Sequence, residues 1–206
     1  MALPKKYLPL PSPAVATINY IDLAEGVTIL NGYTTEKAGT TQYGLTTGTP
    51  YSYLVSTSGS LGTNASFSGS FYTGELNRPM LLKGTAIVSM TWRVTNSTSS
   101  NNNFPFARLR KYDGTTTTEI AEVSGSIVSS AAGLMRTTSL KITNIPATLI
   151  KAGEQIEMNV GITGENAGNS PRGFIAHDPQ NRDDDWFTTG NFDTTKLIIG
   201  IPSKIN

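Results

Sequence analysis

The stretch Gly84-Thr-Ala-Ile-Val-Ser-Met-Thr-Trp-Arg-Val94 decides the fold of this chain, because apolar and polar side chains alternate along it. Its apolar side consists of Ala86, Val88, Met90, Trp92 and Val94. A period of two over this length indicates a β-strand with one buried face. We therefore expect a strand at 84–94, with Trp92 in the core.

The stretch from Gln155 to Thr163 repeats this pattern nearer the C-terminus. Its apolar side consists of Ile156, Met158, Val160 and Ile162, and Glu157 and Asn159 lie on the other side. This alternation predicts a second strand of the same kind.

The dipeptide Asp113-Gly114 separates two further strand-like runs, at 104–112 and 115–123. Asp-Gly tolerates the positive φ values of a type I′ turn, so we expect these runs to pair as a hairpin. Other short runs with strand character lie at 15–21, 27–30, 51–57, 65–72, 137–143, 174–176 and 194–201. We expect a long loop or loose hairpin at 31–50 and a turn or short 3₁₀ segment at 144–147.

The composition favours an all-β fold. The 206 residues include 20 Gly and 11 Pro, and Ser and Thr together make up about a quarter of the chain. Thr fits a pleated surface, whereas Gly and Pro break helices. About eight to ten strands separated by turn signals indicate an antiparallel β-sandwich, jelly-roll-like in arrangement.

The chain divides into an arm and one domain. The prolines at 4, 9, 11 and 13 each fix φ and remove an N–H donor, so we expect an extended arm at 1–14 and a single β-sandwich domain at 15–206. The arm carries Leu3, Tyr7, Leu8 and Leu10. These apolar side chains leave two hypotheses open, a disordered leader or an arm that docks on a neighbouring subunit.

The charge of the chain and the composition of its segments restrict the classes of partner that we expect. With a net charge of +1 and 15% charged residues, the chain indicates neither nucleic acid nor a membrane as its partner. No apolar run reaches the ~20 residues of a membrane span, and the start of the chain does not read as a signal peptide. The absence of cysteine excludes disulfides, thiolate metal sites and cysteine nucleophiles.

The segment 177–185 holds the most reactive side-chain types. His177 is the only histidine, and the chain has no G-x-S-x-G elbow, so we expect a loop histidine that hydrogen-bonds locally and not a catalytic triad. Asp178, Asp183 and Asp185 are candidate Ca²⁺ ligands, although their spacing departs from that of an EF-hand loop. The alternative is a solvated acidic loop with no cofactor.

Paired carboxylates for glycoside hydrolysis are not evident. Glu119 and Glu122 are three residues apart in a predicted strand, so we expect them to face opposite sides, and Glu154 and Glu157 share this spacing. The sequence therefore predicts that the protein is not an enzyme.

The strand at 104–112 carries a basic and aromatic face. Arg108 and Arg110 share it with Phe104 and Phe106. Such a face can stack single-stranded nucleic acid, but the chain is close to neutral. A subunit interface, where Arg and aromatic residues are enriched, agrees better with the sequence.

Four aromatic residues could form a sugar-binding platform: Tyr51, Tyr53, Trp92 and Trp186. Trp92 is assigned to the core, whereas Trp186 follows a polar loop and is the better candidate for contact with a ligand or partner. A carbohydrate-binding module or adhesin head domain is therefore the alternative to an assembly subunit.

The Pro-rich apolar arm, the turn sequences Leu109-Arg-Lys-Tyr-Asp-Gly-Thr115 and Lys151-Ala-Gly-Glu-Gln-Ile156, and His177-Asp-Pro179 together resemble small β-sandwich virion proteins of tailed phages and related viruses. Beyond the arm, the resemblance covers residues 84–201. It implies a capsid, capsid-decorating or tail-associated subunit, made in the host cytoplasm and assembled into the virion as symmetric copies. Its partners would be copies of itself and other virion proteins. The expected interface consists of Leu3, Tyr7, Leu8, Leu10, Phe104, Phe106, Arg108, Arg110 and Trp186.

Overall fold

Twelve β-strands make up the part of the chain that the computed structural model describes, which is residues 26–61, 65–95, 102–129, 135–165, 171–185, 187 and 194–205. The strands are β1 Val27–Lys37, β2 Thr40–Thr46, β3 Ser56–Ser60, β4 Ala65–Tyr72, β5 Met80–Thr95, β6 Asn102–Tyr112, β7 Thr117–Ser124, β8 Val128–Ser129, β9 Met135–Ile150, β10 Gln155–Glu165, β11 Arg172–Ala176 and β12 Ile198–Ile205. In these residues, no helix has the length and apolar character needed to cross a membrane. The expected arm at 1–14 and the expected strand at 15–21 lie outside them.

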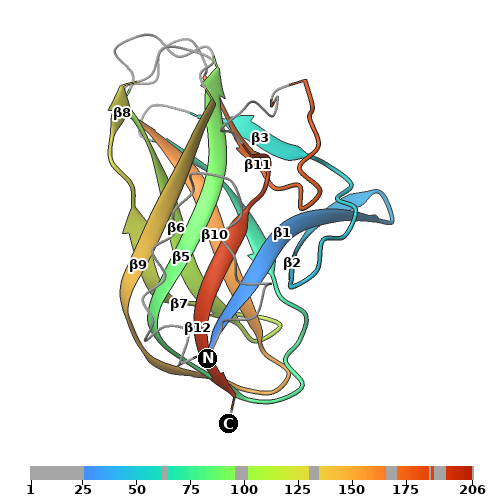
Figure 1. The fold of residues 1–206 in the computed structure, drawn as a ribbon, viewed down its shortest axis with the longest axis vertical. Coiled ribbons are helices and arrows are strands. Elements are labelled where there is room, and N and C mark those ends of the chain that lie inside the picture. Colours follow the sequence, from blue (N-terminus) through green and yellow to red (C-terminus); the bar gives the residue numbers. More distant parts are fainter. Residues whose placement is uncertain are drawn as a thin grey trace, which may run out of the picture.

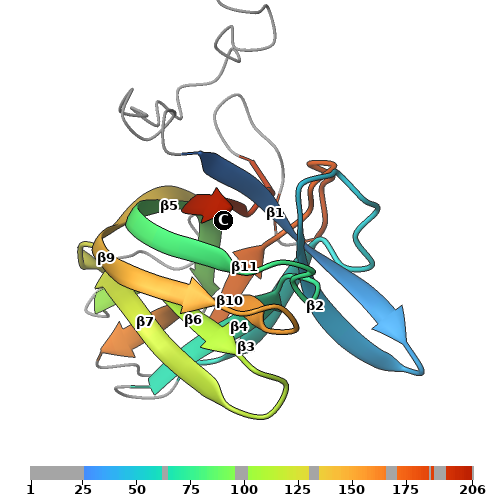
Figure 2. The same cartoon turned by 90° about the horizontal axis from the view of Figure 1, so that it is seen from below.

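The strands form a sandwich of two layers (Figures 1 and 2). In one layer β5 is central, with β9 along one edge and β12 and then β11 along the other. From there β1 and β2 extend beyond β12, and β3 lies beyond β11. The second layer has the order β4-β10-β6-β7, with β8 also paired to β6. A single parallel bridge between Gly44 of β2 and Tyr72 of β4 joins the layers, and the other pairings are antiparallel.

The core lies between the layers and is filled largely by β5 and β10. Their apolar rows, Ala86, Val88, Met90, Trp92, Val94, Ile156, Met158, Val160 and Ile162, are all buried. The indole N–H of Trp92 donates to Thr138 Oγ1 of β9 at 2.9 Å, so the one polar atom of this buried ring is satisfied. The two amphipathic strands, the burial of Trp92 and the all-β sandwich class are confirmed.

The first hairpin is better formed than the sequence predicted. Residues 31–50 hold most of β1 and all of β2, which pair across a two-residue turn at Ala38 and Gly39. Both turn residues have positive φ values, 51° and 74°. A turn with two positive φ values matches the twist of the flanking strands. Here a non-glycine residue, Ala38, occupies the first of its two positions.

Two local predictions are wrong. The turn expected at 144–147 lies inside β9, where Asn144 takes a φ of 58° and the pairing with β5 shifts register, so the irregularity is a bulge within a continuous strand. The hairpin after β6 does form, but its loop is residues 113–116. Gly114 has positive φ and Asp113 does not. The Asp113 carboxylate accepts hydrogen bonds from the N–H groups of the next residues at 115 and 116, which holds a wider turn than type I′.

Candidate functional site

The loop between β2 and β3 presents two tyrosine rings to solvent, and we name residues 51–55 the aromatic loop. Tyr51 is 66% exposed and Tyr53 is 49% exposed, whereas Ser52 between them is fully buried. Exposed and buried side chains therefore alternate here, but the strand expected at 51–57 is not present as a whole. Only its end belongs to β3, because side-chain hydroxyls and not a neighbouring strand hold this backbone.

Buried hydroxyl groups tie the aromatic loop to β1. Thr34 of β1 donates its backbone N–H to Ser52 Oγ at 2.9 Å, and the Ser52 hydroxyl donates to the Leu54 carbonyl at 2.6 Å. The N–H of Tyr53 donates to the Thr34 carbonyl at 2.8 Å, and that of Leu54 donates to Thr34 Oγ1 at 2.9 Å. Because Thr34 and Ser52 are fully buried, water does not compete for these bonds.

A cation from a second loop holds the aromatic loop from the other side. The guanidinium carbon of Arg182 lies 4.0 Å from the Tyr51 ring centroid, within cation–π distance. Arg182 Nη2 donates to the Ser52 carbonyl at 2.5 Å. The Arg182 nitrogens Nε and Nη2 donate to the two carboxylate oxygens of buried Asp178 at 3.0 and 3.2 Å. This hydrogen-bonded pair with Asp178 raises the pKa of Arg182, so the cation is permanent.

The structure does not gather the three candidate Ca²⁺ ligands into a metal site. Both oxygens of Asp178 are engaged by Arg182, whose backbone N–H also donates to Oδ2 at 2.6 Å. Asp183 and Asp185 are exposed. Across the described ranges, no three His, Cys, Asp or Glu side chains are placed to hold a metal ion. Trp186 lies outside the described residues.

His177 is a core residue. It is fully buried, with ring centroids 6.0 Å from Tyr43 and 5.5 Å from Phe71. Neither ring nitrogen has a hydrogen-bond partner among the described residues, so the expectation of a locally bonded loop histidine is wrong for the side chain. Burial lowers the pKa of His177 to about 4, because the protonated ring would lose its hydration. The ring is therefore neutral at pH 7.

The outer side of β10, β6 and β7 carries a ladder of charges, which we name the charged face: Glu157, Arg108, Arg110, Glu119 and Glu122. Glu157 is 1% exposed. Its carboxylate accepts from Ser70 Oγ at 2.7 Å, Arg110 Nη1 at 3.3 Å and Thr117 Oγ1 at 3.2 Å. The carboxylate is thus hydrogen-bonded by three donors, of which Arg110 also compensates its charge, as a buried carboxylate requires.

The pairing of β6 with β7 corrects the expected placement of Glu119 and Glu122. A register shift places Glu122 opposite Arg108 and Glu119 opposite Arg110, so both carboxylates lie on the charged face. Arg108 Nε lies 3.0 Å from a Glu122 oxygen and 4.0 Å from a Glu119 oxygen. A bulge adds one residue between the two acids, which a strict period of two cannot show.

The four expected interface residues of β6 differ in exposure. Phe104, Arg108 and Arg110 are partly exposed, but Phe106 is 3% exposed, with the Arg108 guanidinium 4.7 Å above its ring. Phe106 is therefore not offered to a partner, and both arginines already have carboxylate partners within the chain. An interface on this face stays a prediction. Leu3, Tyr7, Leu8 and Leu10 lie outside the described residues.

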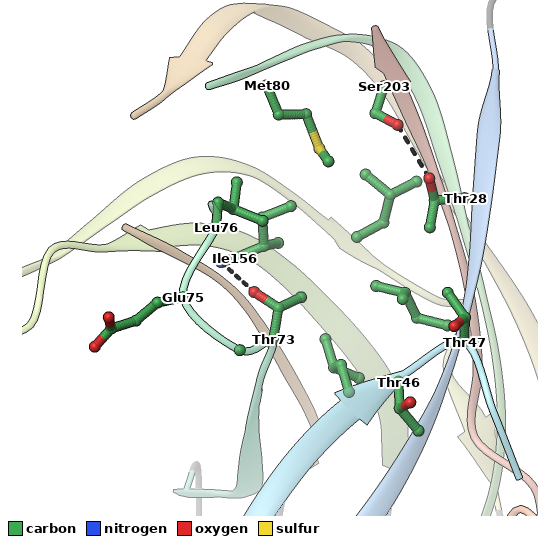
Figure 3. A pocket seen from close by; sticks show the side chains of 13 residues that line it. Thr28, Thr46, Thr47, Thr73, Glu75, Leu76, Met80, Ile156 and Ser203 are labelled. Atoms are coloured by element: carbon green, nitrogen blue, oxygen red, sulfur yellow. Dashed lines mark hydrogen bonds between the residues drawn. The ribbon is translucent and has the colours of Figure 1, made fainter. Parts of the chain in front are cut away.

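A pocket of about 290 Å³ opens at one end of the sandwich (Figure 3), and we name it the end pocket. Its apolar lining consists of Leu30, Leu45, Leu76, Met80, Ile156 and Ile201, which come from both layers and from the β4–β5 connection. None of its lining residues is among those that fix the aromatic loop.

Comparisons with known proteins show a likeness in fold. No family model matches the chain, and neither does any curated protein. A CocE/NonD family hydrolase from Staphylococcus aureus is similar over 88% of this chain and 36% of its own, with 13% identity and a TM-score of 0.50. An alpha-amino acid ester hydrolase is similar over 66% of this chain and 25% of its own, with 8% identity and a TM-score of 0.46. TmCBM61 in complex with beta-1,4-galactotriose shares 16% identity over 58% of this chain and 65% of its own, with a TM-score of 0.24.

The chain thus spans only about a quarter to a third of the two hydrolases. At this identity, the first likeness supports the sandwich fold and carries no activity over to this chain.

Sequence reasoning missed the residues that support the aromatic loop. Tyr51 and Tyr53 were recognisable as aromatic residues around a serine, but nothing in the sequence assigns Thr34 or Arg182 to them. Arg182 stands four residues after Asp178, and this spacing was the one available signal of an ion pair within the 177–185 loop.

Proposed function

We propose that this chain is a structural subunit of a virion, in a capsid, capsid-decorating or tail-associated position, and that the aromatic loop is a contact surface. The observation that carries the proposal is the exposure of Tyr51 and Tyr53 on a loop fixed by buried hydrogen bonds. A tyrosine ring with few free torsions loses little entropy on binding, and interface residues that dominate affinity are enriched in Tyr and Arg.

The polar groups that could carry out chemistry hold the fold together instead. His177 is buried between aromatic rings, Asp178 binds Arg182, and Glu157 is engaged by three donors. Because these groups are engaged within the fold, we assign the function to contacts that the surface makes with other molecules. The resemblance to small β-sandwich virion proteins points in the same direction.

Sedimentation of the labelled full-length chain with purified virus particles from the source of the sequence tests this proposal. We expect the chain to sediment with the particles and the double variant Tyr51→Ala/Tyr53→Ala to stay in the supernatant. Ile127→Ala is the matched control, because Ile127 is 57% exposed and lies outside the aromatic loop. No binding by the intact chain would overturn the virion role, and equal binding by the double variant would overturn the role of the loop.

A carbohydrate-binding module is the second candidate, and the same tyrosines favour it. Ligand sites combine aromatic surfaces with a few fixed polar groups, and Tyr51 is backed by the guanidinium of Arg182. Binding of the full-length chain to a glycan array, lost in Tyr51→Ala, would support this function. If the chain still binds particles when the glycan that binds best on the array is added in excess, the loop contacts a protein partner and not a carbohydrate.

A further inference from the structure

The end pocket is apolar inside, and one acidic residue, Glu75, lies at its rim with its carboxylate directed away from the other lining side chains (Figure 3). Six large apolar side chains line its interior, whereas the exposed residues Thr47, Gly74 and Glu75 lie at the opening. A packed protein interior has few voids larger than a water molecule, so an open apolar pocket of about 290 Å³ has room for apolar side chains of a partner.

The walls of this pocket are held in place by hydrogen bonds. The Thr73 hydroxyl accepts from the N–H of Ile156 at 3.0 Å, which fixes the β4–β5 connection to β10. Across the pocket, the hydroxyls of Thr28 and Ser203 are 3.1 Å apart and hydrogen-bonded (Figure 3). These bonds within the chain hold the walls in place, so a segment entering the pocket would not need to reorganise the sandwich.

The chain enters the described structure beside this pocket. Gly26 is the first described residue, and its carbonyl accepts from the N–H of Ser203 at 2.9 Å. Ser203 is itself a lining residue. Another 25 residues precede Gly26 in the sequence, and in extended form they span up to ~80 Å, enough to reach a neighbouring molecule.

The chemistry of this preceding segment matches the pocket. In Leu8-Pro-Leu-Pro11, two large apolar side chains alternate with prolines that have no N–H to satisfy, which lowers the cost of burial. Lys5 and Lys6 stand just before these leucines and are complementary in charge to Glu75 at the mouth. Prolines also favour an extended path, and an extended segment of this length can reach another molecule.

We propose that Leu8 and Leu10 of one copy occupy the end pocket of a second copy, with Lys5 and Lys6 opposite Glu75. This inference rests on the proposed assembly function and names one contact between copies. The aromatic loop remains free for another partner.

Disulfide trapping tests this contact, because the natural chain has no cysteine. Two full-length single-cysteine variants, Leu10→Cys and Gly74→Cys, are mixed and oxidised at high protein concentration. Gly74 tolerates the change, since a Cβ there meets no atom within 4 Å. We expect a cross-linked species of twice the 22.0 kDa chain mass. The matched control pairs Leu10→Cys with Thr118→Cys, an exposed position on β7 outside the pocket lining.

A yield from the Gly74→Cys mixture no higher than that of the control would overturn the proposal. So would cross-linking confined within one chain in the double variant Leu10→Cys/Gly74→Cys. Adding Glu75→Lys to the Gly74→Cys partner should lower the yield severalfold, and Glu36→Lys, at an exposed end of β1, should not. If the chain binds particles but gives no cross-link, the virion function is supported and this contact is wrong. If the cross-link forms but the chain does not bind particles, the contact is supported and the virion function is wrong.

Discussion

Arg182 joins the exposed aromatic loop to the buried carboxylate of Asp178, because its guanidinium stacks 4.0 Å from the Tyr51 ring while binding both oxygens of Asp178. Asp178 is fully buried, and Arg182 retains 30% of its side-chain exposure. The exposed ring thus depends on a buried carboxylate two contacts away.

Replacing Arg182 with methionine should destabilise the protein. The change leaves the Asp178 carboxylate buried beside backbone N–H groups alone, so we expect the free energy of unfolding to fall by about 2 kcal/mol. Urea denaturation at pH 7 measures this change. Arg172→Met is the control, because Arg172 is exposed and donates to Ser58 Oγ on the surface; its effect should stay within about 0.5 kcal/mol. Equal losses in both variants would contradict the role assigned to Arg182.

The charged face offers a second matched pair of substitutions. Glu157→Gln removes a buried charge that faces Arg110 and places an amide where two hydroxyl donors point, so we expect a loss of about 1–3 kcal/mol. Glu122→Gln removes an exposed partner of Arg108 and should cost no more than about 0.5 kcal/mol. Chemical denaturation of both variants gives the difference, and its absence would show that Glu157 is solvated.

The fold was predictable because its determinants are local in the sequence. Alternation in β5 and β10 identified the strands and Trp92 as core, and Asp113-Gly114 located a turn. The irregular features of the strands were not predicted. The bulge at Asn144 and the register shift between β6 and β7 each depend on a partner strand that the local pattern does not contain.

The candidate site was predictable only in part, for a related reason. Tyr51 and Tyr53 were identified as aromatic candidates, but their support comes from Thr34 and Arg182, which lie on separate elements. His177 was placed in a polar loop because its neighbours in sequence are charged. The structure buries it against Tyr43 and Phe71, two residues far away in the chain.

Gly161 should not accept even a methyl group. A Cβ at this position would lie 2.3 Å from the Phe106 ring and 2.6 Å from the backbone oxygen of Phe67, and a backbone atom cannot rotate away. We expect Gly161→Ala to cost about 1–3 kcal/mol, seen as a lower Tm by calorimetry. Gly74→Ala is the control, because its Cβ meets open space and the Tm should stay close to that of the natural protein. An unchanged Tm for Gly161→Ala would show that β4 and β6 lie further from Gly161 of β10 than these distances imply.

Stability should fall in mild acid because of His177. Its pKa is about 4 in the folded protein, against the ordinary 6.5 that the unfolded chain has. Between these values the unfolded state binds a proton that the folded state excludes, so stability is full above pH 6.5 and is lost as the pH falls toward 4. At 1.36 kcal/mol for each pKa unit, the complete loss is about 3 kcal/mol. Urea denaturation between pH 8 and pH 4.5 measures most of it.

His177→Phe isolates this contribution, since phenylalanine keeps a planar ring against Tyr43 and Phe71 but does not titrate. The variant should lose about 2 kcal/mol less than the natural protein over the same pH range. Carboxylates common to both proteins cancel in this difference. Asp113, whose pKa is held below 3.8 by the N–H groups of Thr116 and Thr115, titrates beneath the range. The slope with pH, and not the absolute stability, is the readout, so a packing cost of the larger ring does not hide the result. Parallel pH profiles would mean that His177 reaches a proton acceptor in solution.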